Sequence, residues 1–146
     1  MAHIAWHNGV METPERTVMT LWIASSRLEI EEWWEAKEIP LSEGGARKGQ
    51  YVGFRDHAMR AIERMKSVHH LDSINKHNIL VMEIRLSAEA FIAMATEKIY
   101  DNCWLPRLHY VSYTNSMDEW GVWYYHGQPF PLNARGVYVF PPQEIQ

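Results

Sequence analysis

The sequence predicts a single α+β domain with a mixed or antiparallel sheet and two to three helices. Short runs rich in β-branched and aromatic residues alternate with amphipathic helical patterns through the first two thirds of the chain, and three β-rich segments follow residue 104. The chain has 146 residues, of which 47% are hydrophobic, and no linker-like stretch divides it. We therefore expect one domain over 1–146, with 1–17 as an N-terminal arm or a short edge strand.

The first strand and helix are predicted between Val18 and Pro40. The apolar run Val18–Ala24 is typical of a strand covered on both faces. Ser26 and Glu29 have the spacing of a capping box, which predicts that a helix begins here, and Pro40 cannot continue it. Three apolar residues at i, i+3 and i+4 predict its buried face: Ile30, Trp33 and Trp34.

A second strand and helix are predicted after a polar loop at 41–50 that contains three glycines. Tyr51–Phe54 reads as a brief strand, and Asp56 is placed to cap the helix that follows. The apolar stripe of this helix consists of Ala58, Ile62 and Met65, widened by Met59 and Ala61. The histidine-rich segment 67–78 then predicts a loop.

The remaining elements are another strand and helix and a β-rich end. Ile79–Leu86 is the clearest strand, and Ser87 is expected to cap a helix over Ala88–Glu97. Its inward residues are predicted to be Phe91, Met94 and Ala95. The segments LHYVSY, GVWYYH and GVYVF then predict three strands that pack on the same sheet.

Composition limits the possible functions. With 14 basic and 18 acidic residues the net charge is −4, which argues against a general nucleic-acid binder, although Arg47 and Lys48 form a local basic patch. Cys103 is the only cysteine, so no internal disulfide forms and a reducing compartment is favoured. The first residues show no secretory signal, and no apolar run approaches the ~18 residues of a membrane span. These features predict a soluble cytoplasmic protein without membrane contact.

Three local patterns contain side chains that could form a chemical site. His69, His70, Asp72 and His77 match no zinc-ligand spacing, so a solvated loop is predicted and no metal site. Cys103, which lies near Asp101 and His109 in the sequence, reads as a small buried hydrophobe rather than a nucleophile. The loop at 41–50 lacks Walker spacing but is compatible with a mobile lid over an anionic ligand.

Seven tryptophans and seven tyrosines form either an aromatic core or a groove that stacks a flat ring, such as a base or nicotinamide. In order of elements, the chain over about 18–140 resembles the ADP-ribosyltransferase-like fold of toxin-type transferases and RNA 2′-phosphotransferases. The similar segments are LWIASS with its helix and EIP, YVGFRDHAMRAIERM, ILVMEIRLSAEAF and GVWYYHGQPFPLNARGVYVF.

This resemblance implies NAD as cofactor and transfer of ADP-ribose from NAD to a macromolecular acceptor. Glu119 would be the catalytic carboxylate that stabilises the oxocarbenium-like charge, with Trp22, Arg27 and Tyr51 lining the nucleotide pocket. The family places a His or Arg in the first strand, where this chain has Trp22 and Ile23. A non-catalytic binding protein on a degenerate fold of this kind is therefore the alternative. Both hypotheses expect Trp22, Tyr51 and Glu119 to meet around one cleft.

Overall fold

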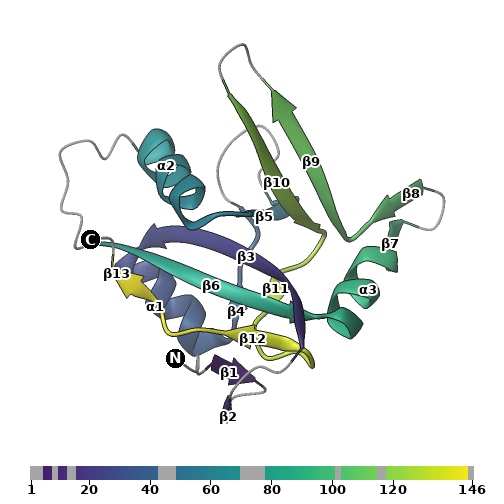
Figure 1. The fold of residues 1–146 in the computed structure, drawn as a ribbon, viewed down its shortest axis with the longest axis horizontal. Coiled ribbons are helices and arrows are strands. Elements are labelled where there is room, and N and C mark those ends of the chain that lie inside the picture. The colour runs from purple at the N-terminus through teal and green to yellow at the C-terminus, as the bar shows by residue number, and fades with distance from the viewer. Residues whose placement is uncertain are drawn as a thin grey trace.

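Strands and helices alternate through the first two thirds of the chain, and strands form its end (Figure 1). The structure is a computed structural model that describes residues 5–7, 10–12, 16–42, 49–69, 78–100, 103–114 and 118–144. These residues form an α+β domain, as predicted. The helices are α1 (Arg27–Ala36), α2 (Ala58–His69) and α3 (Ala88–Thr96). The strands are β1 (Ala5–His7), β2 (Val10–Glu12), β3 (Thr17–Ser26), β4 (Glu38–Ile39), β5 (Tyr51–Arg55), β6 (Ile79–Ser87), β7 (Lys98–Tyr100), β8 (Cys103–Pro106), β9 (Leu108–Thr114), β10 (Glu119–His126), β11 (Phe130–Pro131), β12 (Val137–Val139) and β13 (Gln143–Glu144).

The main sheet has the strand order β2-β1-β12-β6-β3-β5-β10-β9, and β13 also pairs with β6. Every pair of neighbours is antiparallel. Two small antiparallel pairs lie outside it, β4 with β11 and β7 with β8. The described strands of the N-terminal region, β1 and β2, form one edge of the sheet.

The long strands β3 and β6 lie side by side at the centre of the fold (Figure 1). In β6 the four residues from Ile79 to Met82 are all buried before alternation begins, as predicted. In β3 the prediction of a covered strand holds for the middle of the strand and fails at its start. Leu21 and Ser25 are buried and residues 22–24 are partly buried, but Val18 is 59% exposed.

Local capping explains where α1 and α3 begin and where α1 ends. The Ser26 hydroxyl accepts a hydrogen bond from the Glu29 amide at 3.3 Å, and the Ser87 hydroxyl accepts one from the Ala90 amide at 3.1 Å. Helix α1 ends where Lys37 adopts the left-handed conformation with φ of 59°. The helix therefore ends before Pro40, and the left-handed Lys37, rather than the proline as predicted, sets the boundary.

Helix α2 corrects two predictions. The amide of Met59 donates to Nδ1 of His57 at 3.1 Å, so the imidazole of His57, and not the carboxylate of Asp56, makes this cap contact. The Asp56 carboxylate accepts a hydrogen bond from the Tyr110 hydroxyl instead. The side chain of Met59 is 55% exposed, whereas the neighbouring Ala61 is buried. The apolar stripe is therefore narrower than predicted.

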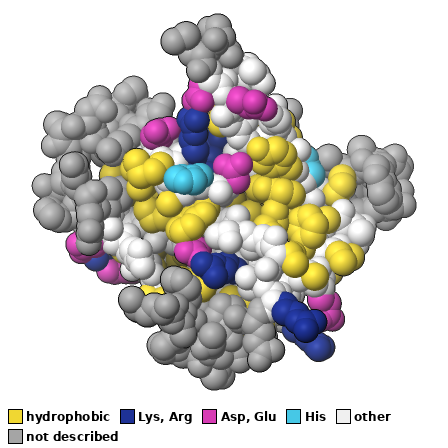
Figure 2. Space-filling model, viewed as in Figure 1, with side chains coloured by type: hydrophobic (Ala, Val, Ile, Leu, Met, Phe, Trp, Pro, Cys, Tyr) yellow, Lys and Arg dark blue, Asp and Glu magenta, His cyan; other side chains and the backbone are white. Residues whose placement is uncertain are grey.

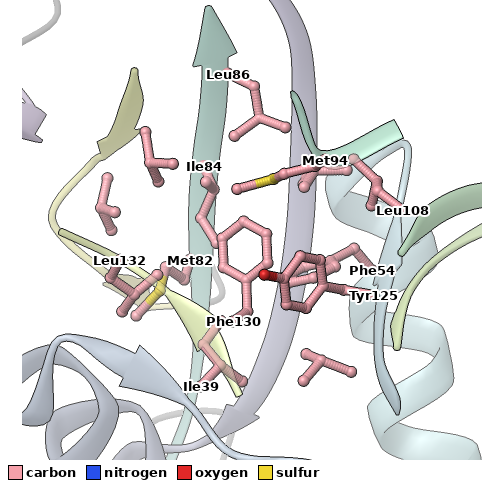
Figure 3. Packing of buried hydrophobic residues seen from close by; sticks show 14 of the residues in the cluster. Ile39, Phe54, Met82, Ile84, Leu86, Met94, Leu108, Tyr125, Phe130 and Leu132 are labelled. Atoms are coloured by element: carbon pink, nitrogen blue, oxygen red, sulfur yellow. The ribbon is translucent and has the colours of Figure 1, made fainter. Parts of the chain in front are cut away.

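The core lies between one face of the sheet and the helices α1 and α3. Phe130 is fully buried and meets two rings edge-on, Phe54 at 4.8 Å and Tyr125 at 4.9 Å between centroids (Figure 3). Ile39 of β4 pairs with Phe130 of β11, which fastens the segment after α1 to this cluster. The core thus joins residues that lie about 90 positions apart along the chain.

The sheet is nearly divided between β3 and β5. Nine register pairs join β3 to β6, and five join β5 to β10. Among the described residues, Trp22 and Arg55 are the one register pair between β3 and β5. Beyond this pair the two strands separate, so the hairpin of β9 and β10 with β5 forms a second half of the sheet (Figure 1).

The surface is mixed in character. Hydrophobic side chains spread over the centre of the face in Figure 2, and acidic, basic and histidine side chains gather above them. No helix formed by the described part of the chain is long and apolar enough to span a membrane.

Candidate ligand-binding cleft

A cleft of about 860 Å³ opens where β3 and β5 separate. It is lined by residues 22–25 of β3 and by Tyr51, Val52, Gly53 and Arg55 of β5, with α1, α2, β10 and the segment 39–42 around them. If the antiparallel pairing of β3 and β5 continued beyond Trp22–Arg55, residues 23–25 would pair with residues 52–54. The cleft therefore lies where these pairs are absent, with the backbone of β3 on one side and the backbone of β5 on the other.

Aromatic side chains form much of the wall. Trp22, Trp33, Tyr51 and Tyr124 all line the cleft, and each is partly exposed. Tyr51 meets Tyr124 edge-on at 4.8 Å between centroids, with an angle of 89° between the rings. The Tyr124 hydroxyl also shares a hydrogen bond of 2.6 Å with the Tyr113 hydroxyl. These contacts hold the ring of Tyr51 in place, so a ligand would meet a largely pre-formed aromatic wall.

Arg55 is the cation at the inner end of this wall. Its side chain is half-buried, and no hydrogen bond or ion pair joins its guanidinium to any residue that the structure describes. Burial, followed by the positive charge of Arg64, lowers the pKa of Arg55. Because a half-buried charge without a partner is unfavourable, this position favours an anionic group from outside the chain. Arg64 of α2 lines the same cleft and adds a second cation.

Two carboxylates of α1 lie on the opposite side of the cleft from α2. Glu29 is engaged within its own turn, because its Oε1 accepts hydrogen bonds from the hydroxyls of Ser25 at 3.2 Å and Ser26 at 3.3 Å. Glu32 is exposed. The cleft therefore has a cationic end, formed by arginines, and an acidic end.

Trp22 and Tyr51 meet in this cleft as expected, but Glu119 does not join them. Alternation along β10 points Glu119 to the opposite side of the strand from Tyr124, because the two positions differ by an odd number. The Glu119 carboxylate accepts a hydrogen bond from the Ser112 hydroxyl at 3.4 Å and lines another cavity. The expectation of one cleft shared by all three side chains is therefore wrong.

The cavity beside Glu119, of about 870 Å³, lies between the first turns of α2 and the start of β10. Four carboxylates line it: Asp56, Glu63, Asp118 and Glu119. Its arginine, Arg60, binds Asp118 through two hydrogen bonds of 2.6 and 2.7 Å, which lower the pKa of Asp118. Asp118 is thus held in an ion pair with the helix α2. A cavity of this charge disfavours phosphate groups.

Arg27 is also absent from the cleft. Its guanidinium at the start of α1 pairs with Glu144 of β13 and lies 3.8 Å from Glu31. Both partners are carboxylates of the chain itself, so the structure gives this arginine a place in an ion-pair group rather than in a phosphate site.

Some residues of the predicted sites lie outside the described part of the chain. This applies to 43–48 of the glycine-rich loop, including Arg47 and Lys48, to the side chain of His69 and the histidine-rich segment 70–77, and to Asp101 and the side chain of Cys103. Within the described ranges, no group of three or more His, Cys, Asp or Glu side chains could hold a metal ion.

Comparisons of the chain with protein-family models, curated proteins and solved structures found no match. The residues of the cleft therefore carry the functional argument by themselves. Sequence reasoning missed Arg55 and Tyr124. For Arg55 a signal was present, because positions 51, 53 and 55 share one side of a strand that begins with a proposed ligand residue. Tyr124 could not be found in this way, because its place in the cleft depends on which strand pairs with β5, and no local sequence pattern shows that pairing.

Proposed function

We propose that the cleft between β3 and β5 binds a nucleotide of the NAD or ADP-ribose type. The observation that carries this proposal is the half-buried Arg55 guanidinium, without a partner among the described residues, at the end of an aromatic wall. A phosphate group would supply the missing partner through charge-assisted hydrogen bonds. Trp22 and Tyr51 would contact the base or nicotinamide ring.

Size and backbone support the same ligand class. A volume of about 860 Å³ falls within the roughly 300–1,000 Å³ of small-molecule sites. The backbone of β3 and β5 that borders the cleft offers donors and acceptors to the edge of a base or to a carboxamide. The order of strands and helices is consistent with the ADP-ribosyltransferase-like resemblance, which we retain as a proposal for the fold.

Of the two hypotheses, binding without transfer is the one that the geometry favours. Transfer of ADP-ribose needs a carboxylate against the ribose, where positive charge develops. Glu119 lies in the acidic cavity, and Glu29 is engaged with two serine hydroxyls. Among the described residues, the remaining carboxylate of the cleft is Glu32, which is exposed. We therefore propose a binding protein for the nucleotide rather than an active transferase.

Ligand-induced stabilisation tests the binding proposal. We expect NAD or ADP-ribose at about 100 times its dissociation constant to add about 2.7 kcal/mol to the free energy of unfolding, visible as a higher Tm. Arg55→Met should abolish most of this shift, and Tyr51→Ala should weaken it. Tyr110→Ala is the matched control, because Tyr110 is an exposed tyrosine that lines the other cavity. Wild-type protein that shows no shift with either nucleotide at millimolar concentration would overturn the proposal.

Release of nicotinamide separates binding from transfer. We expect wild-type protein incubated with NAD to release none above the spontaneous rate. Release by the wild type that is lost in Glu32→Gln or in Glu119→Gln would establish an enzyme, and the variant that loses it would identify the carboxylate. Bound NAD that remains intact supports the binding protein.

A further inference from the structure

Two small residues border the middle of the cleft, one on each strand. Continued from the pair Trp22–Arg55, the antiparallel register brings Ala24 opposite Gly53. Both residues line the cleft, and both are partly exposed. Larger side chains flank them, because alternation places Trp22 on the same side of β3 as Ala24, and Tyr51 and Arg55 on the same side of β5 as Gly53. The middle of the cleft is therefore bordered by main chain more than by side chains.

Neither the backbone nor the packing requires a glycine at position 53. The φ of Gly53 lies outside the left-handed region. A β-carbon at this position would meet the ring of Tyr51 at 3.6 Å and a methyl group of Val122 at 3.7 Å, which are ordinary van der Waals contacts. A side chain would thus fit, and glycine inside a strand loses more conformational entropy on folding and packs against nothing. The reason for a glycine lies in the space in front of it.

This space belongs to the cleft. A side chain at position 53 would point to the side that carries Tyr51 and Arg55, and both of these line the cleft. Glycine in a strand often marks a place where a ligand approaches the main chain closely. Gly53 and Arg55 are two residues apart, about 6.7 Å along the strand. This spacing suits a phosphate at Arg55 that a ribose separates from a ring at Gly53.

We infer that Gly53 and Ala24 form a seat for a planar ring, and that Gly53 limits the thickness of the group that the cleft admits. The inference rests on the proposed function and adds the part of the nucleotide that lies between the two strands. A flat ring can lie against main chain at about 3.5–4.0 Å over its whole area, whereas the hydroxyl groups of a sugar hold its ring away from a surface. The seat therefore takes a base or a nicotinamide and not the ribose.

Binding of three probes to wild type and to variants of the seat tests this inference. AMP and nicotinamide mononucleotide carry a ring, a ribose and a phosphate, whereas ribose 5-phosphate lacks the ring. We expect Gly53→Val to weaken the binding of at least one mononucleotide about tenfold or more, measured by NMR titration, because the branched side chain fills the seat. Binding of ribose 5-phosphate should stay unchanged. Gly53→Ala should have a smaller effect in the same direction, and so should Ala24→Val.

Two controls separate the seat from a role in folding. The Tm of Gly53→Val without ligand should equal or exceed that of wild type, since valine favours a strand more than glycine does. Ser112→Val adds bulk at an exposed position of β9 outside the cleft and should leave the binding of all three probes unchanged. In wild type, the amide signals of Ala24 and Gly53 should move with the bound mononucleotide and stay in place with ribose 5-phosphate.

The outcomes distinguish the seat from the nucleotide proposal. Wild type that binds neither mononucleotide would overturn the nucleotide proposal and the seat with it. If wild type binds a mononucleotide and Gly53→Val binds it equally well, the seat alone is refuted. Equal losses of the mononucleotide and of ribose 5-phosphate would also refute it, because Gly53 would then act on the whole cleft. Should Gly53→Val fail to fold, Gly53→Ala and the wild-type amide signals decide the matter.

Discussion

The hydroxyl of Tyr110 lies over Gly121, at 1.6 Å from the place where a β-carbon of residue 121 would be. A side chain at this position must displace the ring of Tyr110. The displaced ring would lose its hydrogen bond of 3.3 Å to Asp56 and its contact with Trp123 at 5.1 Å. We expect Gly121→Ala to lower the free energy of unfolding by about 1 kcal/mol, measured by urea denaturation. In a Tyr110→Ala background the same substitution should cost almost nothing, and an equal cost in both backgrounds would contradict this explanation.

The ion pair between Arg60 and Asp118 predicts a dependence of stability on acid pH. Its hydrogen bonds lower the pKa of Asp118 in the folded protein. The stabilisation is therefore present above the unfolded pKa of about 4 and is lost as the pH falls through the folded value. We expect Asp118→Asn to be less stable than wild type at pH 7 and the difference to shrink between pH 5 and pH 3. Asp118→Asn in an Arg60→Met background, where the ion pair is already absent, is the control and should not show this convergence.

Tyr124 predicts the corresponding behaviour at alkaline pH. Burial and the hydrogen bond with Tyr113 raise the pKa of Tyr124. The stabilisation is complete below the unfolded pKa of about 10 and is lost as the pH rises above it. We expect the unfolding free energy of Tyr124→Phe to fall less than that of wild type between pH 9 and pH 11, measured by guanidinium denaturation. Tyr113→Phe should keep most of the wild-type loss, because burial is the larger cause; identical curves for wild type and Tyr124→Phe would refute the assignment.

Phe130 is predicted to be among the most costly positions to truncate. It is fully buried between Phe54 and Tyr125, and it anchors the short pair of β4 and β11. We expect Phe130→Ala to lower the free energy of unfolding by about 3–5 kcal/mol, since the change removes a large buried ring and leaves a cavity. Ile92→Ala, at a position 58% exposed, should change it by less than about 0.5 kcal/mol. A loss below about 1 kcal/mol for Phe130→Ala would show that the core closes over the gap.

Local patterns predicted most of the elements because their causes are local. The capping serines Ser26 and Ser87 act within one helical turn, and the apolar run of β6 extends within one strand. Pairing of Ile39 with Phe130 depends on residues far apart in the chain, and no local pattern could predict it. His57 replaced Asp56 as the cap because the carboxylate has a partner in a distant strand, Tyr110 of β9.

The candidate site was predicted in part for the same reason. Trp22 and Tyr51 were assigned from their strands, and both strands border the cleft. Arg27 was assigned by its closeness to Trp22 in sequence, but the start of a helix turned it toward Glu144. For Glu119, alternation within β10 already places its side chain on the opposite side of the strand from Tyr124. Once the strand itself is predicted, the side to which Glu119 points follows from the sequence. The separation of β3 from β5 was not, because it results from the packing of the whole sheet.

The pair Trp22–Arg55 has a mechanical consequence. Because it is the one register pair between β3 and β5 among the described residues, side-chain packing joins the two halves of the sheet more than strand hydrogen bonds do. The core cluster supplies this packing, since it combines Phe54 and Tyr125 of one half with Leu21 and Met82 of the other. Trp22 and Arg55 also line the cleft, so a substitution at either position alters the ligand wall and the link between the two halves together.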